Sequence, residues 1–89
     1  MRRNPDFLLR RVADSVVVVP VGAATAAFPG MITLNDTGAY LWELLEQEQT
    51  VETLTAAMTE RYDVEQALAR KDVEAFVARL IPTGAILES

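Results

Sequence analysis

The sequence predicts a single α+β domain over residues 1–89, with a small three-stranded antiparallel sheet followed by three helices. Two observations point to this order. The first third of the chain holds β-branched and apolar runs separated by turn residues, which is typical of consecutive strands. The remainder holds apolar residues at helical spacing. Because the chain has only 89 residues, we expect one hydrophobic core and no deep catalytic cleft beside it.

The predicted strands lie between residues 7 and 34. Residues 7–12 form the first strand, and a turn at residues 13–15 leads into a run of four valines that bends or ends near Pro20. Residues 22–30 are the least regular part, in which residues 25–28 are expected to extend a strand before the turn residues Pro29 and Gly30. Residues 31–34 form the last strand, which leaves the sheet with an exposed edge.

The first helix is predicted at residues 36–47, directly after the last strand. Asn35 is a strong N-cap candidate, and Asp36 complements the positive end of the helix dipole. A glycine costs roughly 1 kcal/mol relative to alanine inside a helix, so Gly38 on the apolar face indicates a close approach of the helix to the sheet. The apolar face is formed by Gly38, Leu41, Trp42 and Leu45, at i, i+3, i+4 and i+7.

Two further helices are expected in the C-terminal half. The second is capped by Thr50. The third begins after Asp63, with Gln66 three residues on in an arrangement resembling a capping box, and runs to about Ile81. Pro82 and Gly84 end it, and the apolar residues 85–87 are expected to pack back on the core. The apolar stripe of the third helix consists of Val73, Phe76, Val77 and Leu80.

The composition argues against catalysis. The chain contains no histidine and no cysteine, which removes an imidazole base, a thiolate nucleophile, a disulfide and a Cys/His metal site. Asp72 and Glu74 are two residues apart on a predicted helix and therefore point apart. We expect no enzyme activity, no cofactor and no metal.

The charge argues against nucleic acid as a partner, since the net charge is −5 and the sequence pI is about 4.5. Arg2, Arg3, Arg10 and Arg11 cluster near the N-terminus, but the surface is interpreted as solvated with mixed charges. No apolar run approaches the roughly 20 residues of a membrane span, and the N-terminus lacks the apolar core of a signal peptide. A cytoplasmic protein without a membrane partner is expected.

Three functions are open on these residues alone. Two short helices and a longer one are typical of winged-helix DNA-binding regulators, but the third helix carries three residues of each charge sign rather than a positive excess. An exposed strand edge beside an amphipathic helix is also typical of domains that bind an extended peptide as an added strand. The third possibility is a structural subunit whose apolar groove docks a fixed protein partner.

Five short motifs resemble the PqqD-like family, also called RiPP recognition elements. Asp36 stands where the family usually has glutamate, and residues 20–30 depart most from the common pattern. The motifs span most of the chain in the family's order: LNDTG at 34–38, LWELL at 41–45, TVE at 50–52, YDV at 62–64, and DV at 72–73 followed by Phe76.

The resemblance implies a winged-helix-like fold and a non-catalytic chaperone or adaptor. Such proteins bind the leader of a ribosomally synthesised precursor peptide by strand addition and present the peptide to a modifying enzyme, often a radical S-adenosylmethionine enzyme. The member that names the family serves pyrroloquinoline quinone biosynthesis. A monomer or a strand-exchanged dimer is expected. Carried onto this chain, the resemblance places the peptide beside Met31, Ile32, Thr33, Leu34, Val73, Phe76, Val77 and Leu80.

Overall fold

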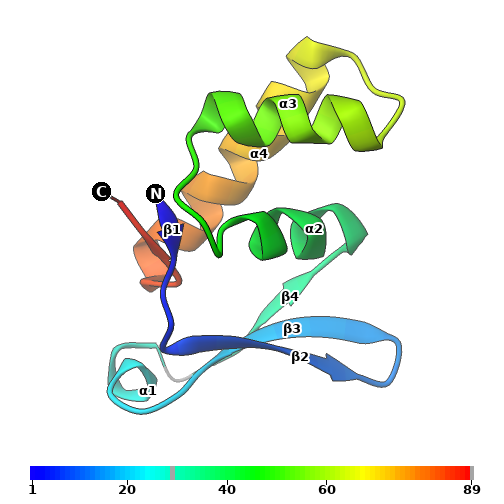
Figure 1. Cartoon of the computed structure of the whole chain (residues 1–89). Helices are drawn as coiled ribbons and strands as arrows, with labels where there is room; N and C mark the ends of the chain where they lie inside the picture. Colours follow the sequence, from blue (N-terminus) through cyan, green and yellow to red (C-terminus); the bar gives the residue numbers. More distant parts are fainter. Residues whose placement is uncertain (29, 89) are drawn as a thin grey trace.

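The computed structural model describes residues 1–28 and 30–88, so Pro29 in the irregular segment and the terminal Ser89 lie outside the described residues. Strands β2 (Phe7–Val12), β3 (Ser15–Pro20) and β4 (Ile32–Leu34) form a three-stranded antiparallel sheet in the order β2-β3-β4. Helices α2 (Asp36–Leu44), α3 (Val51–Arg61) and α4 (Gln66–Leu80) lie on one side of it (Figure 1). The predicted α+β class, with three strands before three helices, is confirmed.

The core forms between this sheet and the helices. Because side chains alternate along a strand, Val16, Val18, Ile32 and Leu34 all face the helices and are buried. Helix α2 lies against them, and Trp42 is only 2% exposed. The same core is completed from α3 and α4 by Leu54, Met58, Ala69, Val73, Phe76, Val77 and Leu80.

Two of the three predicted helix starts have the expected caps. The Asn35 side chain accepts a hydrogen bond from the Gly38 amide at 2.8 Å, and Thr50 and Thr53 form a reciprocal capping box at the start of α3. The capping arrangement predicted for the third helix is wrong. Its N-cap is Glu65, which makes no side-chain cap bond, so Gln66 is the first helical residue and not the third.

The irregular segment also differs from the prediction. Residues 25–28 do not extend a strand; they belong to a short helix, α1 (Ala24–Ala27), and the residue that follows it. Alanine is the best helix former, and the amides of Ala24, Thr25 and Ala26 each bond to the carbonyl three residues back. These local bonds are available without any strand partner, which explains why a helical turn forms here.

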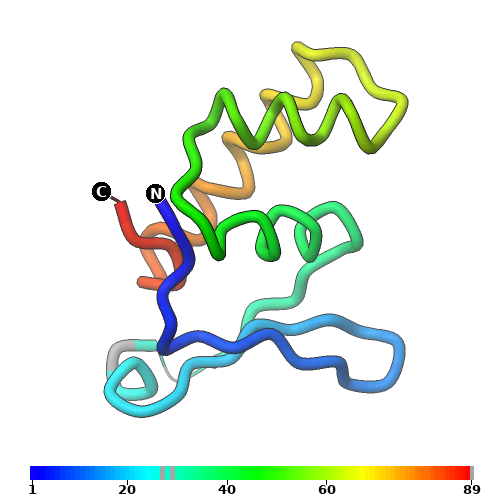
Figure 2. The backbone as a smooth tube through the Cα atoms, viewed as in Figure 1, coloured from blue at the N-terminus to red at the C-terminus, as the bar shows by residue number. Residues whose placement is uncertain are grey.

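The C-terminal tail packs back as predicted and forms an additional strand that the pattern did not reveal. After α4, a 3-10 turn, η1 (Ile81–Thr83), leads to Gly84, whose left-handed φ of 87° ends the helical path. Strand β5 (Ile86–Leu87) then pairs antiparallel with β1 (Arg2–Arg3). Figure 2 shows the first and last segments of the backbone running side by side.

Candidate functional site

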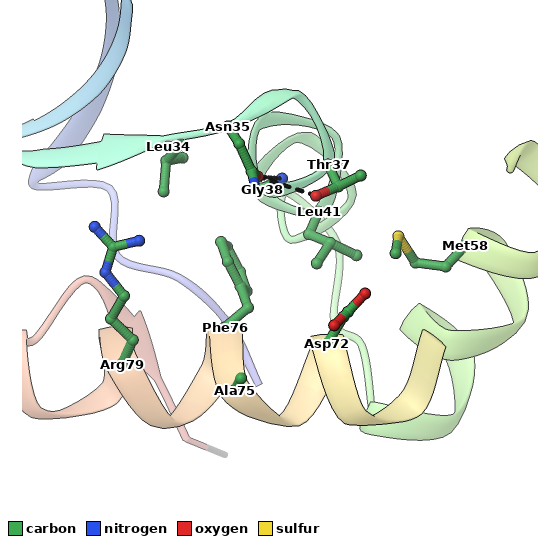
Figure 3. A pocket seen from close by; sticks show the side chains of 10 residues that line it. All are labelled: Leu34, Asn35, Thr37, Gly38, Leu41, Met58, Asp72, Ala75, Phe76 and Arg79. Carbon is green, nitrogen blue, oxygen red and sulfur yellow. Dashed lines mark hydrogen bonds between the residues drawn. The ribbon is translucent and has the colours of Figure 1, made fainter. Parts of the chain in front are cut away.

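A groove of about 290 Å³ lies between α4 and the junction of β4 with α2 (Figure 3). Two elements far apart in the sequence form its walls. The junction supplies one wall, and the face of α4 that carries positions 72, 75, 76 and 79 supplies the other, since residues three or four apart share a helix face. Its lining consists of Leu34, Asn35, Thr37, Gly38, Leu41, Met58, Asp72, Ala75, Phe76 and Arg79.

The middle of the groove is apolar. Leu34, Leu41, Met58 and Phe76 are all buried, so only small parts of these side chains meet solvent there. Gly38 lets the walls come this close. A Cβ atom at this position would lie 3.4 Å from Cε1 of Phe76 and 3.1 Å from Oδ1 of Asn35. The close approach predicted from the glycine is confirmed, and it involves α4 as well as the sheet.

The two ends of the groove carry opposite charges. Asp72 lies at the end near Leu41 and Met58, whereas Arg79 lies at the end near Leu34, with Phe76 between them (Figure 3). Arg79 does more than line the wall, because its Nη2 atom donates a hydrogen bond of 2.8 Å to the carbonyl oxygen of Thr33. The described groove is therefore closed at one end by an arginine bound to the strand edge.

The backbone of Thr33 faces away from the sheet. The Val21 amide donates to the Asp6 carbonyl at 2.8 Å, so these two residues form a hydrogen-bonded pair. Along the antiparallel β2-β3 ladder, hydrogen-bonded and non-hydrogen-bonded pairs alternate from this point. By that alternation, the backbone groups of Val17 face β2. Thr33, which lies opposite Val17, therefore belongs to a non-hydrogen-bonded pair, and its N–H and C=O point out of the sheet. The bond from Arg79 to the Thr33 carbonyl agrees with this orientation.

The structure brings some of the predicted site residues to this edge. Leu34 and Phe76 line the groove, and Thr33 presents its backbone beside it. Met31, which precedes β4, is 62% exposed. Ile32 is buried and faces the core on the same side of the strand as Leu34, but it does not line the groove.

The remaining predicted residues lie on the buried face of α4. Val73 and Leu80 are 0% exposed, and Val77 is also buried; none of the three lines the groove. The apolar spacing predicts the buried stripe of α4, whereas the groove is lined by the neighbouring stripe of the helix, which carries Asp72 and Arg79. The useful signal in the sequence was the pair of charged residues seven positions apart that flank Phe76 on one helix face. Peptide contacts by any of these residues stay a prediction.

The groove has the features of a binding site for an extended chain. It combines an outward strand edge, an apolar floor and two separated charges. Among residues 1–28 and 30–88, no three His, Cys, Asp or Glu side chains gather in a group that could hold a metal ion. None of the described helices has both the length and the apolar character needed to cross a bilayer.

Comparisons with known proteins agree with the resemblance seen in the sequence. One similar solved structure is "TbiB1 in Complex with the TbiA(beta) Leader Peptide", with a TM-score of 0.77 and 19% identity, covering 100% of this chain and 98% of that one. Another is "Lasso peptide synthetase B1 complexed with the leader peptide", with a TM-score of 0.74 and 23% identity, covering 98% of this chain and 96% of that one. At these identities the likeness establishes a shared fold. A comparison with curated protein sequences gave no significant match. The model of the family described as "Coenzyme PQQ synthesis protein D (PqqD)" matches residues 15–86, and the chain therefore belongs to the PqqD family.

Proposed function

We propose that this protein is a non-catalytic adaptor that binds the leader of a ribosomally synthesised precursor peptide and presents it to a modifying enzyme. The observation that carries the proposal is the outward-facing backbone of Thr33 beside a groove with an apolar floor. Membership of the PqqD family supports it, as do the two structures of the same fold that were solved with leader peptides. We further propose a radical S-adenosylmethionine enzyme as the partner.

The leader is proposed to add to β4 as a fourth strand of the sheet. Its backbone would pair with the N–H and C=O of Thr33, each net hydrogen bond contributing about 0.5–1.5 kcal/mol. Alternate side chains of the added strand would point toward α4, where Phe76 offers an apolar contact. The Thr33 carbonyl already accepts a bond from Arg79, so the guest must share or displace it.

A role without catalysis is supported by the chemistry of the chain. The sequence has no histidine and no cysteine, and the charged residues of the groove, Asp72 and Arg79, lie at its opposite ends. Two such groups can orient a peptide through its charges. They do not form the adjacent acid–base or nucleophile–base pair on which most hydrolytic and transfer mechanisms depend.

Strand addition is tested by titration with the leader segment of a short precursor peptide, taken from the genes that neighbour that of this protein. Thr33→Pro deletes the outward amide donor and is expected to weaken binding by about tenfold, the effect of losing one to two kcal/mol. Thr33→Val is the matched control, because it changes the side chain and keeps the amide. Thermal melting of both variants shows whether the fold survives. Equal binding by Thr33→Pro and Thr33→Val would rule out strand addition at this residue.

Amide exchange identifies the surface that the peptide covers. With the leader bound, protection is expected along residues 31–34 and in α4 from Asp72 to Arg79. Phe76→Leu, a swap of similar volume that usually costs under about 1.5 kcal/mol of stability, should weaken binding by reducing the apolar contact. Protection confined to β2 or α2 would show that the peptide uses another surface. The role of the adaptor requires, in addition, that the precursor peptide is modified faster by its enzyme when this protein is present.

A further inference from the structure

A second groove, of about 550 Å³, lies along the opposite edge of the sheet, which is formed by β2. We call it the β2 groove. This groove is bounded by β1, by Trp42 of α2 and by Glu46, which lies just after that helix. It shares no lining residue with the groove of the candidate site, which lies between α4 and the junction of β4 with α2. Strand β3 separates the two edges of the sheet, so occupation of one edge leaves the other free.

The β2 groove is strongly basic in an acidic protein. Residues 1–11 contain four arginines and one aspartate, a net charge of +3, whereas residues 12–89 contain four cationic and twelve acidic residues, a net charge of −8. Arg2, Arg3 and Arg10 line the groove, and Glu46 is its single acidic lining residue. In the folded chain, the positive charge of the N-terminal segment is therefore concentrated along the β2 edge of the sheet.

These arginines are available to a partner. The salt bridges of the described residues involve Met1 and Arg70 with carboxylates elsewhere, and not the arginines of the groove. Arg3 is held in place, since its Nη1 atom donates to the carbonyl of Trp42 at 3.2 Å and its guanidinium lies 5.9 Å from the centroid of the indole ring. A fixed cation loses little conformational freedom when an anion binds beside it.

The backbone of β2 also faces this groove. Hydrogen-bonded and non-hydrogen-bonded pairs alternate from the bond between Val21 and Asp6, and this alternation turns the N–H and C=O of Leu9, which lines the groove, away from β3. The Leu9 carbonyl accepts a bond of 3.2 Å from Nη1 of Arg10, in agreement with this orientation. The β2 groove therefore offers main-chain partners and positive side chains together.

We infer that the β2 groove docks an acidic, extended segment of the modifying enzyme, which pairs with β2 as an added strand. The choice of this partner rests on the proposed function, because an adaptor must hold an enzyme while it holds the leader. The outward backbone groups favour a polypeptide, since they match the repeat of another strand and have no counterpart in DNA or lipid. The net charge of −8 on the rest of the chain repels a large polyanion, which extends beyond the groove. A short acidic segment stays within the groove and is repelled less.

The test uses a labelled peptide of alternating glutamate and valine, with the lysine–valine peptide of equal length as its counterpart. The full chain is expected to bind the glutamate peptide, and to bind it more weakly as salt rises. Joint replacement Arg2→Gln and Arg10→Gln should weaken binding by about tenfold, since it removes two exposed charge contacts. Arg70→Gln is the matched control for a lost surface cation, because Arg70 lies on α4 and pairs with Glu52 and Glu74.

Several results would overturn the inference. These are equal weakening by Arg70→Gln, preference for the lysine peptide, or tighter binding of duplex DNA or of phosphatidylglycerol vesicles than of the glutamate peptide. Displacement of the glutamate peptide by saturating leader peptide would also overturn it, because the grooves would not be independent. If the glutamate peptide binds as expected while the leader does not bind at all, the β2 groove stands and the proposed leader-binding function fails.

Discussion

Replacing Gly38 by alanine tests whether the glycine shapes the groove. Alanine favours a helix by about 1 kcal/mol over glycine, so an unhindered change would stabilise the protein. The new Cβ would lie 3.1 Å from Oδ1 of Asn35, the atom that accepts from the Gly38 amide. Displacing this cap costs about 1 kcal/mol, which cancels the gain. The contacts of 3.4 Å with Cβ of Leu34 and Cε1 of Phe76 are at the short limit of ordinary van der Waals contact, so they add little to this balance.

We therefore expect Gly38→Ala to leave the free energy of unfolding nearly unchanged. Helix propensity alone would raise it by about 1 kcal/mol, or the melting temperature by about 4–8 °C for a domain of this size. Because Asn35 lines the groove, the shift of its side chain that makes room for the new Cβ should weaken leader binding as well. Denaturant unfolding and peptide titration measure the two effects. Comparing Glu43→Ala with Glu43→Gly, at an exposed position of α2, supplies the difference in helix propensity alone. A gain of about 1 kcal/mol with unchanged leader affinity would refute the reasoning.

Two other substitutions address the core and the strand edge. Trp42→Ala should cost about 3–5 kcal/mol of stability because Trp42 is almost fully buried, and a nearly unchanged melting temperature would contradict its place in the core. Arg79→Met keeps an apolar stem and frees the Thr33 carbonyl from a bond worth about 0.5–1 kcal/mol, so leader affinity should rise about two- to fivefold in a fluorescence titration. Weaker leader binding by Arg79→Met would show that the guanidinium contacts the peptide instead.

Local chemistry explains which parts of the fold could be predicted. The start of α2 was predictable because its cap, Asn35, and its close-packed residue, Gly38, act within a few residues of each other. Strands β1 and β5 were not, because each has two residues and its partner lies at the other end of the chain. Nothing in either short segment marks the pairing of Arg2 with Leu87.

The groove was harder to predict than the core. Helical periodicity identifies the stripe of α4 that becomes buried, as it did for Val73 and Leu80. An open groove is lined by the residues that flank such a stripe, here Asp72 and Arg79, and these follow no hydrophobic pattern. How far two elements stay apart depends on their packing in three dimensions, and periodicity along the chain contains no information on that distance.

The pairing of β1 with β5 has a consequence for how this domain can be joined to other proteins. Because Arg2 lies opposite Leu87, the two ends of the described chain leave the domain at the same corner (Figure 1). A flexible tether of a given length therefore starts from nearly the same point whether it is attached to the first or the last residue. A protein linked by that tether has a similar effective concentration at the surface of this domain in both cases. An N-terminal and a C-terminal fusion are thus geometrically equivalent, and the domain can also be inserted into a loop of a host protein without separating the two sides of that loop.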